Sequence, residues 1–385
     1  MAPPRGNRVI ALGRAMSNPH VNRPPGRRVA LLAAIAAALV VIGVGATAAT
    51  AVMPKSHSSP QAASPPPTSE LPASSAASTP PSASASASPP STTAAHWSYP
   101  EPIDQAAVSS DSSTQLNAVS CVAADTCYAV DNQGNILASA SENSWKVADS
   151  AGGGSDSGIG GISCPAAGFC VAIGSGNAII MSGGSWNDPV SVDPNNTLSA
   201  VSCASTTFCV AVGNNGEGYV FTGSITHWSQ VTIDPNQEDL ESVSCPTATF
   251  CVAVDNFGDV YTDRDGTWGQ GADVDNGTEL DIVTCASESF CMAIDHNGNP
   301  VTMANGNWSA STVQLTINAV SCPVDGYCVA GDNSGEVLYY RNGAWTGATK
   351  IDGNNTFTGV KCVAPDACTA VDQNDNVMYY TTSSY

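Results

Sequence analysis

Residues 198–221 read LSAVSCASTTFCVAVGNNGEGYVF, and this stretch decides the fold because its pattern returns along the chain. Two cysteines with five residues between them occur seven times, and these pairs use all 14 cysteines of the sequence. The pairs are Cys121 and Cys127, Cys164 and Cys170, Cys203 and Cys209, Cys245 and Cys251, Cys285 and Cys291, Cys322 and Cys328, and Cys362 and Cys368. Successive pairs begin 37 to 43 residues apart, a period that is typical of repeat architectures.

Each repeat predicts four short strands. In the third repeat, residues 198–203, 208–213, 218–221 and 227–233 are rich in β-branched or aromatic side chains and are bounded by Gly, Asn or Asp. Residues 97–385 show no sustained helical period, so we expect an all-β body. Four antiparallel strands in about forty residues form one blade of a β-propeller, and seven repeats match a common number of blades.

The tryptophans favour a closed ring over a linear solenoid. Each of the first six repeats has one Trp 22 to 25 residues after its first cysteine: Trp145, Trp186, Trp228, Trp268, Trp308 and Trp345. The seventh repeat ends at Tyr385 with no fourth strand, whereas Trp97 begins a surplus strand before the first repeat. A seven-bladed propeller over residues 97–385, in which this N-terminal strand completes the last blade, accounts for both. One Trp per repeat predicts packing between blades more simply than stacking on sugars.

The cysteine spacing predicts disulfides inside the blades. Each pair flanks the hairpin turn between the first and second strands, where opposed Cα atoms lie about 4.5 Å apart. A redox couple usually occurs once rather than seven times, and a zinc site would need converging histidines, of which this part of the chain has His96, His227 and His296. Seven structural disulfides therefore place the repeats outside the cytoplasm.

The N-terminal region predicts a membrane anchor and a stalk. Residues 1–28 form a basic tail, and the uncharged apolar residues 29–53 are long enough for one transmembrane signal-anchor helix. The positive-inside rule then keeps the N-terminus in the cytoplasm and the propeller outside the cell. The alternative is a signal peptide cleaved near Ala51, which would make the protein secreted. Residues 54–96 are rich in Ser, Pro and Ala and predict a disordered stalk.

The charge of the repeats limits the partners. Residues 97–385 contain 32 acidic and 5 basic residues, a net charge of −27. Such a body repels phosphate backbones, so we expect no nucleic-acid partner. An extracellular glycan or a protein is the expected ligand, and a monomeric head is the expected state.

A turn rich in Asp and Gly follows most of the cysteine pairs and supplies the candidate ligand residues. They are Asp131, Asp255, Asp295, Asp332 and Asp372. In the simpler interpretation, each Asp bonds the backbone of its own hairpin turn. In the functional interpretation, the carboxylates line one face, opposite the cysteine hairpins, and bind a cationic ligand or calcium. No other cofactor or metal is predicted.

Two family resemblances support the fold. The stretch DRDGTW at residues 263–268 resembles the Asp-box turn of sialidase-like propellers, and the repeat as a whole resembles the tectonin-type repeat of sugar-binding propellers. The second resemblance implies carbohydrate binding. Sialidases hold the substrate carboxylate with three arginines, and residues 97–385 contain only Arg264 and Arg341, which disfavours that activity.

Three functions follow as hypotheses. The leading one is a non-enzymatic propeller that binds an extracellular glycan or protein, and no catalytic residue is assigned to it. The first alternative is a secreted hydrolase of the glycosidase or lyase kind, which a single non-repeated pair of acids in the central channel would favour. The second is a structural sensor or scaffold ectodomain.

Overall fold

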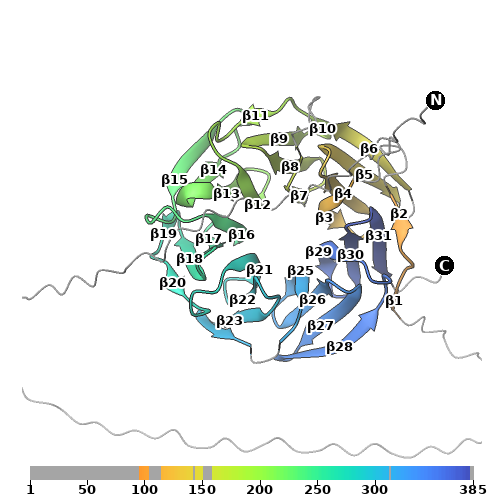
Figure 1. The fold of residues 1–385 in the computed structure, drawn as a ribbon. Helices are drawn as coiled ribbons and strands as arrows, with labels where there is room; N and C mark the ends of the chain where they lie inside the picture. The colour runs from red at the N-terminus through yellow and green to blue at the C-terminus, as the bar shows by residue number, and fades with distance from the viewer. Residues whose placement is uncertain (1–94, 104–113, 142–143, 151–157, 312–313, 382–385) are drawn as a thin grey trace, which may run out of the picture. The chain divides into compact units, whose positions relative to one another are not determined.

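The computed structural model describes residues 95–103, 114–141, 144–150, 158–311 and 314–381, which form seven antiparallel β-sheets arranged as the blades of a ring (Figure 1). Residues 1–94 hold the predicted tail, membrane anchor and almost all of the stalk, and they lie outside the described residues. Within the described ranges, no helix has the length and apolar character needed to cross a membrane.

The blades follow one another along the chain, and the strands of blades one to three have these bounds. Blade one contains β3 (Leu116–Ala123), β4 (Thr126–Asp131), β5 (Asn135–Ser141) and β6 (Ser144–Ser150). Blade two contains β7 (Gly161–Ala166), β8 (Phe169–Gly174), β9 (Asn177–Ser182), β10 (Ser185–Trp186) and β11 (Val190–Ser191). Blade three contains β12 (Leu198–Ser205), β13 (Phe208–Gly213), β14 (Glu217–Phe221) and β15 (Trp228–Thr232), with the short 3₁₀ turn η1 (Asn214–Gly216) between β13 and β14.

Blades four to seven repeat this order. Blade four contains β16 (Leu240–Thr247), β17 (Phe250–Asp255), β18 (Asp259–Arg264), β19 (Thr267–Trp268) and β20 (Ala272–Asp273). Blade five contains β21 (Leu280–Ser287), β22 (Phe290–Asp295), β23 (Pro300–Ala304) and β24 (Asn307–Ala310). Blade six contains β25 (Ile317–Val324), β26 (Tyr327–Asp332), β27 (Glu336–Arg341) and β28 (Ala344–Lys350). Blade seven contains β29 (Phe357–Ala364), β30 (Ala367–Asp372) and β31 (Asn376–Thr381).

Two short segments from the N-terminal side of the chain lie on blade seven. Strands β1 (His96–Trp97) and β2 (Glu101–Pro102) both pair antiparallel with β31 (Figure 1). Trp97 is opposite Tyr380, and its indole N–H donates a hydrogen bond of 2.9 Å to the Tyr339 hydroxyl of blade six. This outer strand therefore contacts two blades at once.

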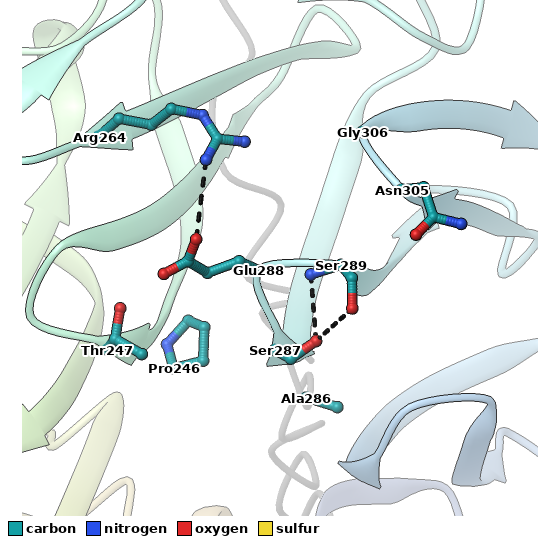
Figure 2. Close-up of a pocket in the computed structure, with 9 residues that line it drawn as sticks. All are labelled: Pro246, Thr247, Arg264, Ala286, Ser287, Glu288, Ser289, Asn305 and Gly306. Carbon is teal, nitrogen blue, oxygen red and sulfur yellow. Dashed lines mark hydrogen bonds and ion pairs between the residues drawn. The ribbon is translucent and has the colours of Figure 1, made fainter. Parts of the chain in front are cut away.

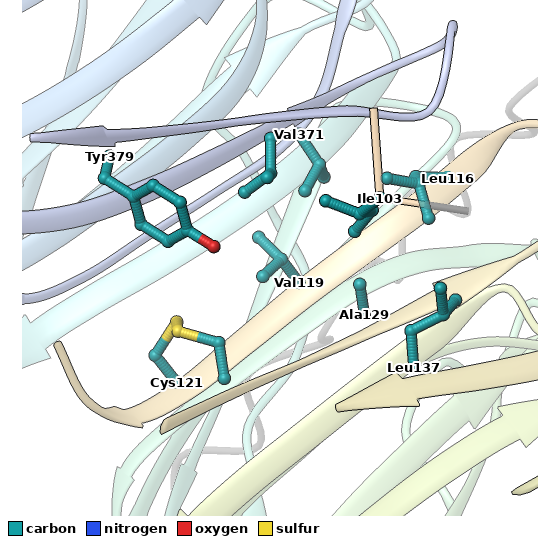
Figure 3. Close-up of a cluster of buried hydrophobic side chains, with 10 residues drawn as sticks. Ile103, Leu116, Val119, Cys121, Ala129, Leu137, Val371 and Tyr379 are labelled. Atoms are coloured by element: carbon teal, nitrogen blue, oxygen red, sulfur yellow. A yellow bond between two sulfur atoms is a disulfide. The ribbon is translucent and has the colours of Figure 1, made fainter. Parts of the chain in front are cut away.

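The hydrophobic core lies between neighbouring blades. Figure 3 shows the cluster in which Leu116, Val119 and Leu137 of blade one meet Val371 and Tyr379 of blade seven. Six further clusters join the other parts of the ring, and each of the seven holds one partly buried tryptophan: Trp97, Trp145, Trp186, Trp228, Trp268, Trp308 and Trp345. The ring is thus held together mainly by apolar packing, and the tryptophans pack as predicted.

All seven predicted disulfides are present. Each joins the first and second strands of one blade, with Cα atoms 3.9 to 4.1 Å apart. Disulfides of this number are typical of an oxidising compartment outside the cytoplasm. Because every one lies within a blade, none links one blade to the next.

The first strand of every blade is the innermost. Strands β3, β7, β12, β16, β21, β25 and β29 surround the centre of the ring (Figure 1), and all seven line a cavity there, which is part of what is called the central channel below. All seven strands run in the same direction along the channel. Each begins next to an Asp turn, as the pairing of Leu240 with Asp255 shows, and ends next to a disulfide, as the pairing of Cys203 with Cys209 shows. Below, the two ends are called the turn end and the cysteine end.

Candidate functional site

The five predicted ligand aspartates are buried inside their own turns. Asp131, Asp255, Asp295, Asp332 and Asp372 have exposed fractions of 5% or less. In each turn one carboxylate oxygen accepts hydrogen bonds from the backbone N–H groups two and four residues further on, as Asp295 does from Asn297 at 2.9 Å and Asn299 at 2.7 Å. These carboxylates hold the turns in shape. Their binding of an external ligand stays a prediction.

Some of these aspartates face a second carboxyl group from the preceding blade. Burial, together with a hydrogen bond and repulsion from Asp372, raises the pKa of Asp352 to about 7. Burial and the neighbouring Asp295 likewise raise the pKa of Asp275. One buried oxygen of Asp352 and one of Asp275 have no hydrogen-bond partner among the described atoms. A carboxyl pair of this kind retains a proton well above the usual range.

At the start of the first strand, next to the turn end of the channel, blades four and five have acids where the other blades have neutral residues. The position four residues before the first cysteine is Glu241 in β16 and Asp281 in β21. In the other blades the same position is Asn117, Gly160, Ser199, Asn318 and Thr358. Two residues earlier, these two blades again have acids, Asp239 and Glu279, where the others have neutral residues. With His296, these four residues form what we call the acidic cluster.

The members of the acidic cluster interact with one another. His296 Nδ1 lies 3.3 Å from Asp281 Oδ1 and 3.7 Å from Glu279 Oε2. The hydrogen bond to Asp281 is the largest cause of a raised pKa at His296. Burial raises the pKa of Glu241 to about 7, and repulsion from Glu279 and Asp281 adds to the shift. Burial also raises the pKa of Asp281, against the lowering effect of His296.

Three members of the cluster could hold a metal ion. Ligand atoms of Glu279, Asp281 and His296 all lie within 4.8 Å of one another. Calcium takes six to eight oxygen ligands, whereas a set of one imidazole nitrogen and two carboxylates suits zinc better. The donor set of this cluster therefore suits zinc better than calcium.

A cavity of about 370 Å³ adjoins the cluster between blades five and six. Asp281 and His296 line one side, and Thr316, Asn318 and Asn333 line the other. Ile282, Ile294 and Ile317 also line the cavity, so its wall is part polar and part apolar, with the negative charge of Asp281 on one side.

Another cavity, of about 460 Å³, lies between the cysteine hairpins of blades four and five (Figure 2). Arg264 and Glu288 form an ion pair of 3.8 Å across it, with more than half of each side chain exposed. Arg264 also packs over the ring of Phe250 at 4.9 Å. Exposed pairs of this kind contribute little energy, and the groove holds no buried polar group that would orient a ligand.

Comparison with known proteins supports the propeller assignment and no more. No protein-family model matches the chain, and a search of curated proteins finds no match. Among solved structures, "YCF48 bound to D1 peptide" matches with a TM-score of 0.60 and 14% identity over 74% of this chain and 97% of that one. "YCF48 from Cyanidioschyzon merolae" matches with a TM-score of 0.59 and 12% identity over 74% and 99% of the two chains. "Structure of U3-55K" matches with a TM-score of 0.60 and 10% identity over 69% and 95%.

The acidic cluster was not predicted from the sequence. Its signal was present, because alignment of the repeats on the cysteines places Glu241 and Asp281 where all other repeats have neutral residues. The Asp-box resemblance, in contrast, marks a structural turn. Asp263 is buried, and it accepts hydrogen bonds from the backbone of Gly266 and Thr267.

Proposed function

We propose that the propeller is a non-enzymatic binding module that holds a positively charged segment of an extracellular protein at the acidic cluster. The observation that carries this proposal is the group of acids that break the repeat: Asp281 lines a cavity of about 370 Å³, and Glu241 lies close enough to Asp281 for the two charges to repel. A Lys or Arg side chain entering this cavity would meet the carboxylate of Asp281, and the nearby Glu241 of blade four would add to the negative potential. The structural neighbour YCF48, which is bound to a D1 peptide, gives the choice of a protein ligand further support. A glycan ligand, which the tectonin resemblance implies, remains the alternative within this function.

The cell-surface setting belongs to the same proposal. Residues 29–53 anchor the chain in the membrane, the stalk of residues 54–96 carries a monomeric propeller outside the cell, and cleavage near Ala51 would release it. The seven disulfides support an oxidising environment. We also propose that β1 and β2 keep the ring closed, because no disulfide joins blade seven to blade one.

The function is tested by a calorimetric titration of the protein with a short Lys- and Arg-rich peptide, in a buffer that contains a chelator. We expect binding that strengthens between pH 6 and pH 8, because Glu241, with a pKa of about 7, becomes ionised over this range. The double variant Glu241→Gln and Asp281→Asn should weaken binding at least tenfold. The control Asp366→Asn removes an exposed acid from a cysteine hairpin and should leave the affinity unchanged.

Two outcomes would contradict the proposal. One is equal binding by the double variant and the parent chain, because general attraction to the acidic body would then explain it. The other is no binding of the peptide by the folded parent chain. Binding that appears only without chelator, on addition of zinc or calcium, would instead assign the cluster to a metal ion.

A second candidate function has one observation in its favour. A carboxyl group with a pKa near 7 next to a second carboxylate is the arrangement of a glycosidase acid and its partner, and Glu241 with Asp281 has this character. Release of reducing sugar from a panel of wall glycans, lost on Glu241→Gln, would establish this activity. Absence of release by the parent chain from every glycan would eliminate it.

A further inference from the structure

The cysteine end of the central channel contains a cavity of about 430 Å³ to which all seven first strands contribute. Each blade supplies the residue that directly precedes its first cysteine. These residues are Ser120, Ser163, Ser202, Ser244, Thr284, Ser321 and Lys361. Six blades thus place a hydroxyl at this position, and blade seven alone places an amine.

The serine hydroxyls of this ring have one bond in common. The Oγ atom of five serines accepts a hydrogen bond of 2.9 to 3.1 Å from the backbone N–H of the first cysteine in the next blade. For example, Ser120 accepts from Cys164, and Ser321 accepts from Cys362. Since the oxygen accepts in these bonds, the hydroxyl proton remains for donation. The ring therefore presents hydrogen-bond donors to the cavity.

Lys361 adds three more donors and a charge to the same cavity. The side chain is half-buried, and among the described residues it makes no hydrogen bond or ion pair. No Asp or Glu lines the cavity, although the described chain is strongly acidic elsewhere. Burial lowers the pKa of Lys361, and no neighbouring carboxylate offsets this effect. An ammonium without a counter-charge at a half-buried position is unfavourable until an anion joins it.

We propose that the cysteine end of the channel binds a small carboxylate, with Lys361 as its charge partner and the serine hydroxyls as its donors. A carboxylate offers only acceptors, so it complements the hydroxyl protons of this ring and the ammonium of Lys361. Next to the hydroxyl ring, Pro165, Pro246 and Pro323 provide an apolar rim that suits a short hydrocarbon tail. This site is separate from the acidic cluster, which lies at the start of the same strands.

The test uses the full-length chain, with sodium butyrate as the probe and calorimetry as the measurement. Lys361→Ser gives blade seven the residue that five other blades have, so the variant is designed to fold. We expect the parent chain to bind butyrate and Lys361→Ser to bind at least tenfold more weakly. Lys361→Arg should retain binding, because it retains the charge. The matched control is Lys146→Ser, which removes an exposed lysine from the outer strand β6.

A second arm distinguishes a free carboxylate from the C-terminus of a protein. A tetrapeptide with a free C-terminus and its C-terminally amidated form are compared with butyrate. Tighter binding of the free tetrapeptide than of butyrate assigns the site to a chain terminus, and similar binding of the two assigns it to small carboxylates. The proposal is overturned if neither butyrate nor the free tetrapeptide binds. It is also overturned if Lys361→Ser binds as tightly as the parent chain, or if amidation leaves the affinity unchanged.

Discussion

Replacement of Glu241 by Gln should stabilise the propeller at alkaline pH and have no effect in acid. Burial and the neighbouring acids raise the pKa of Glu241 from 4.5 to about 7 in the folded protein. The folded state therefore holds this proton more tightly than the unfolded state does. Below pH 4.5 Glu241 is protonated in both states and does not change the free energy of unfolding. As the pH rises, Glu241 lowers the free energy of unfolding, and the effect is complete above pH 7, because the folded protein must then accommodate the charge.

The size of the effect follows from the difference between the two pKa values. A rise of about 2.5 in pKa corresponds to about 3.4 kcal/mol when the whole shift is expressed as stability. The side chain is only half-buried, so solvent screens the repulsion from Glu279 and Asp281. We therefore expect Glu241→Gln to raise the free energy of unfolding by about 1–2 kcal/mol at pH 8.5, and by about zero at pH 4.

Urea unfolding with intact disulfides, in a chelator-containing buffer at pH 4 and pH 8.5, measures this difference. The control is Asp366→Asn, which removes an exposed carboxylate and should have little effect at either pH. An equal gain at both pH values would show that the amide improves packing and that charge is not involved. No gain at pH 8.5 would show that Glu241 is not held in an unfavourable charged state, and the reasoning would fail.

Two further predictions concern the junctions between blades. Asp352→Asn should raise the free energy of unfolding at pH 8.5 but not at pH 4, as urea unfolding at the two pH values would measure. The reason is the raised pKa of Asp352, about 7, which makes its ionised form beside Asp372 unfavourable above that pH. Trp97→Ala should lower the free energy of unfolding by about 2–4 kcal/mol, through loss of the partly buried ring and of its bond to Tyr339. The control Tyr99→Ala, at an exposed position between β1 and β2, should have little effect. A change below about 0.5 kcal/mol for Trp97→Ala would show that β1 does not hold the ring.

The architecture was readable from the sequence because its determinants are local and repeated. Every blade has a cysteine pair at the position that Cys203 and Cys209 occupy in blade three. Trp97 likewise packs in blade seven as Trp145 packs in blade one. The Asp turns were found correctly as turns. Their burial was not readable, because it depends on how the turn folds the carboxylate of Asp295 back onto the N–H groups of Asn297 and Asn299.

The acidic cluster and Lys361 were harder to predict because neither is a motif. Four acids are inconspicuous in a body that contains 32 of them, and only the neighbouring positions of β16 and β21 bring Glu241 and Asp281 to one place. Lys361 is a single residue at a position where the other six repeats have Ser or Thr. Its significance depends on the cavity, on the absence of acids among the cavity residues, and on the use of the serine oxygens as acceptors, all of which require the structure.

A ring of seven similar blades places the same side chain at seven equivalent points, so a residue that the fold itself needs should be present in most repeats. The Asp turns, the disulfides and the serine bonds to the next blade meet this description, and each has a structural partner. Three residues do not recur in this way: Glu241, Asp281 and Lys361. Their side chains form no hydrogen bond between blades among the described residues. These exceptions lie at the two ends of one channel, acidic at the turn end and basic at the cysteine end. Because a strand advances about 3.3 Å per residue, their offset of three residues along the repeat separates the two ends by about 10 Å, so that a ligand at one end need not occupy the other.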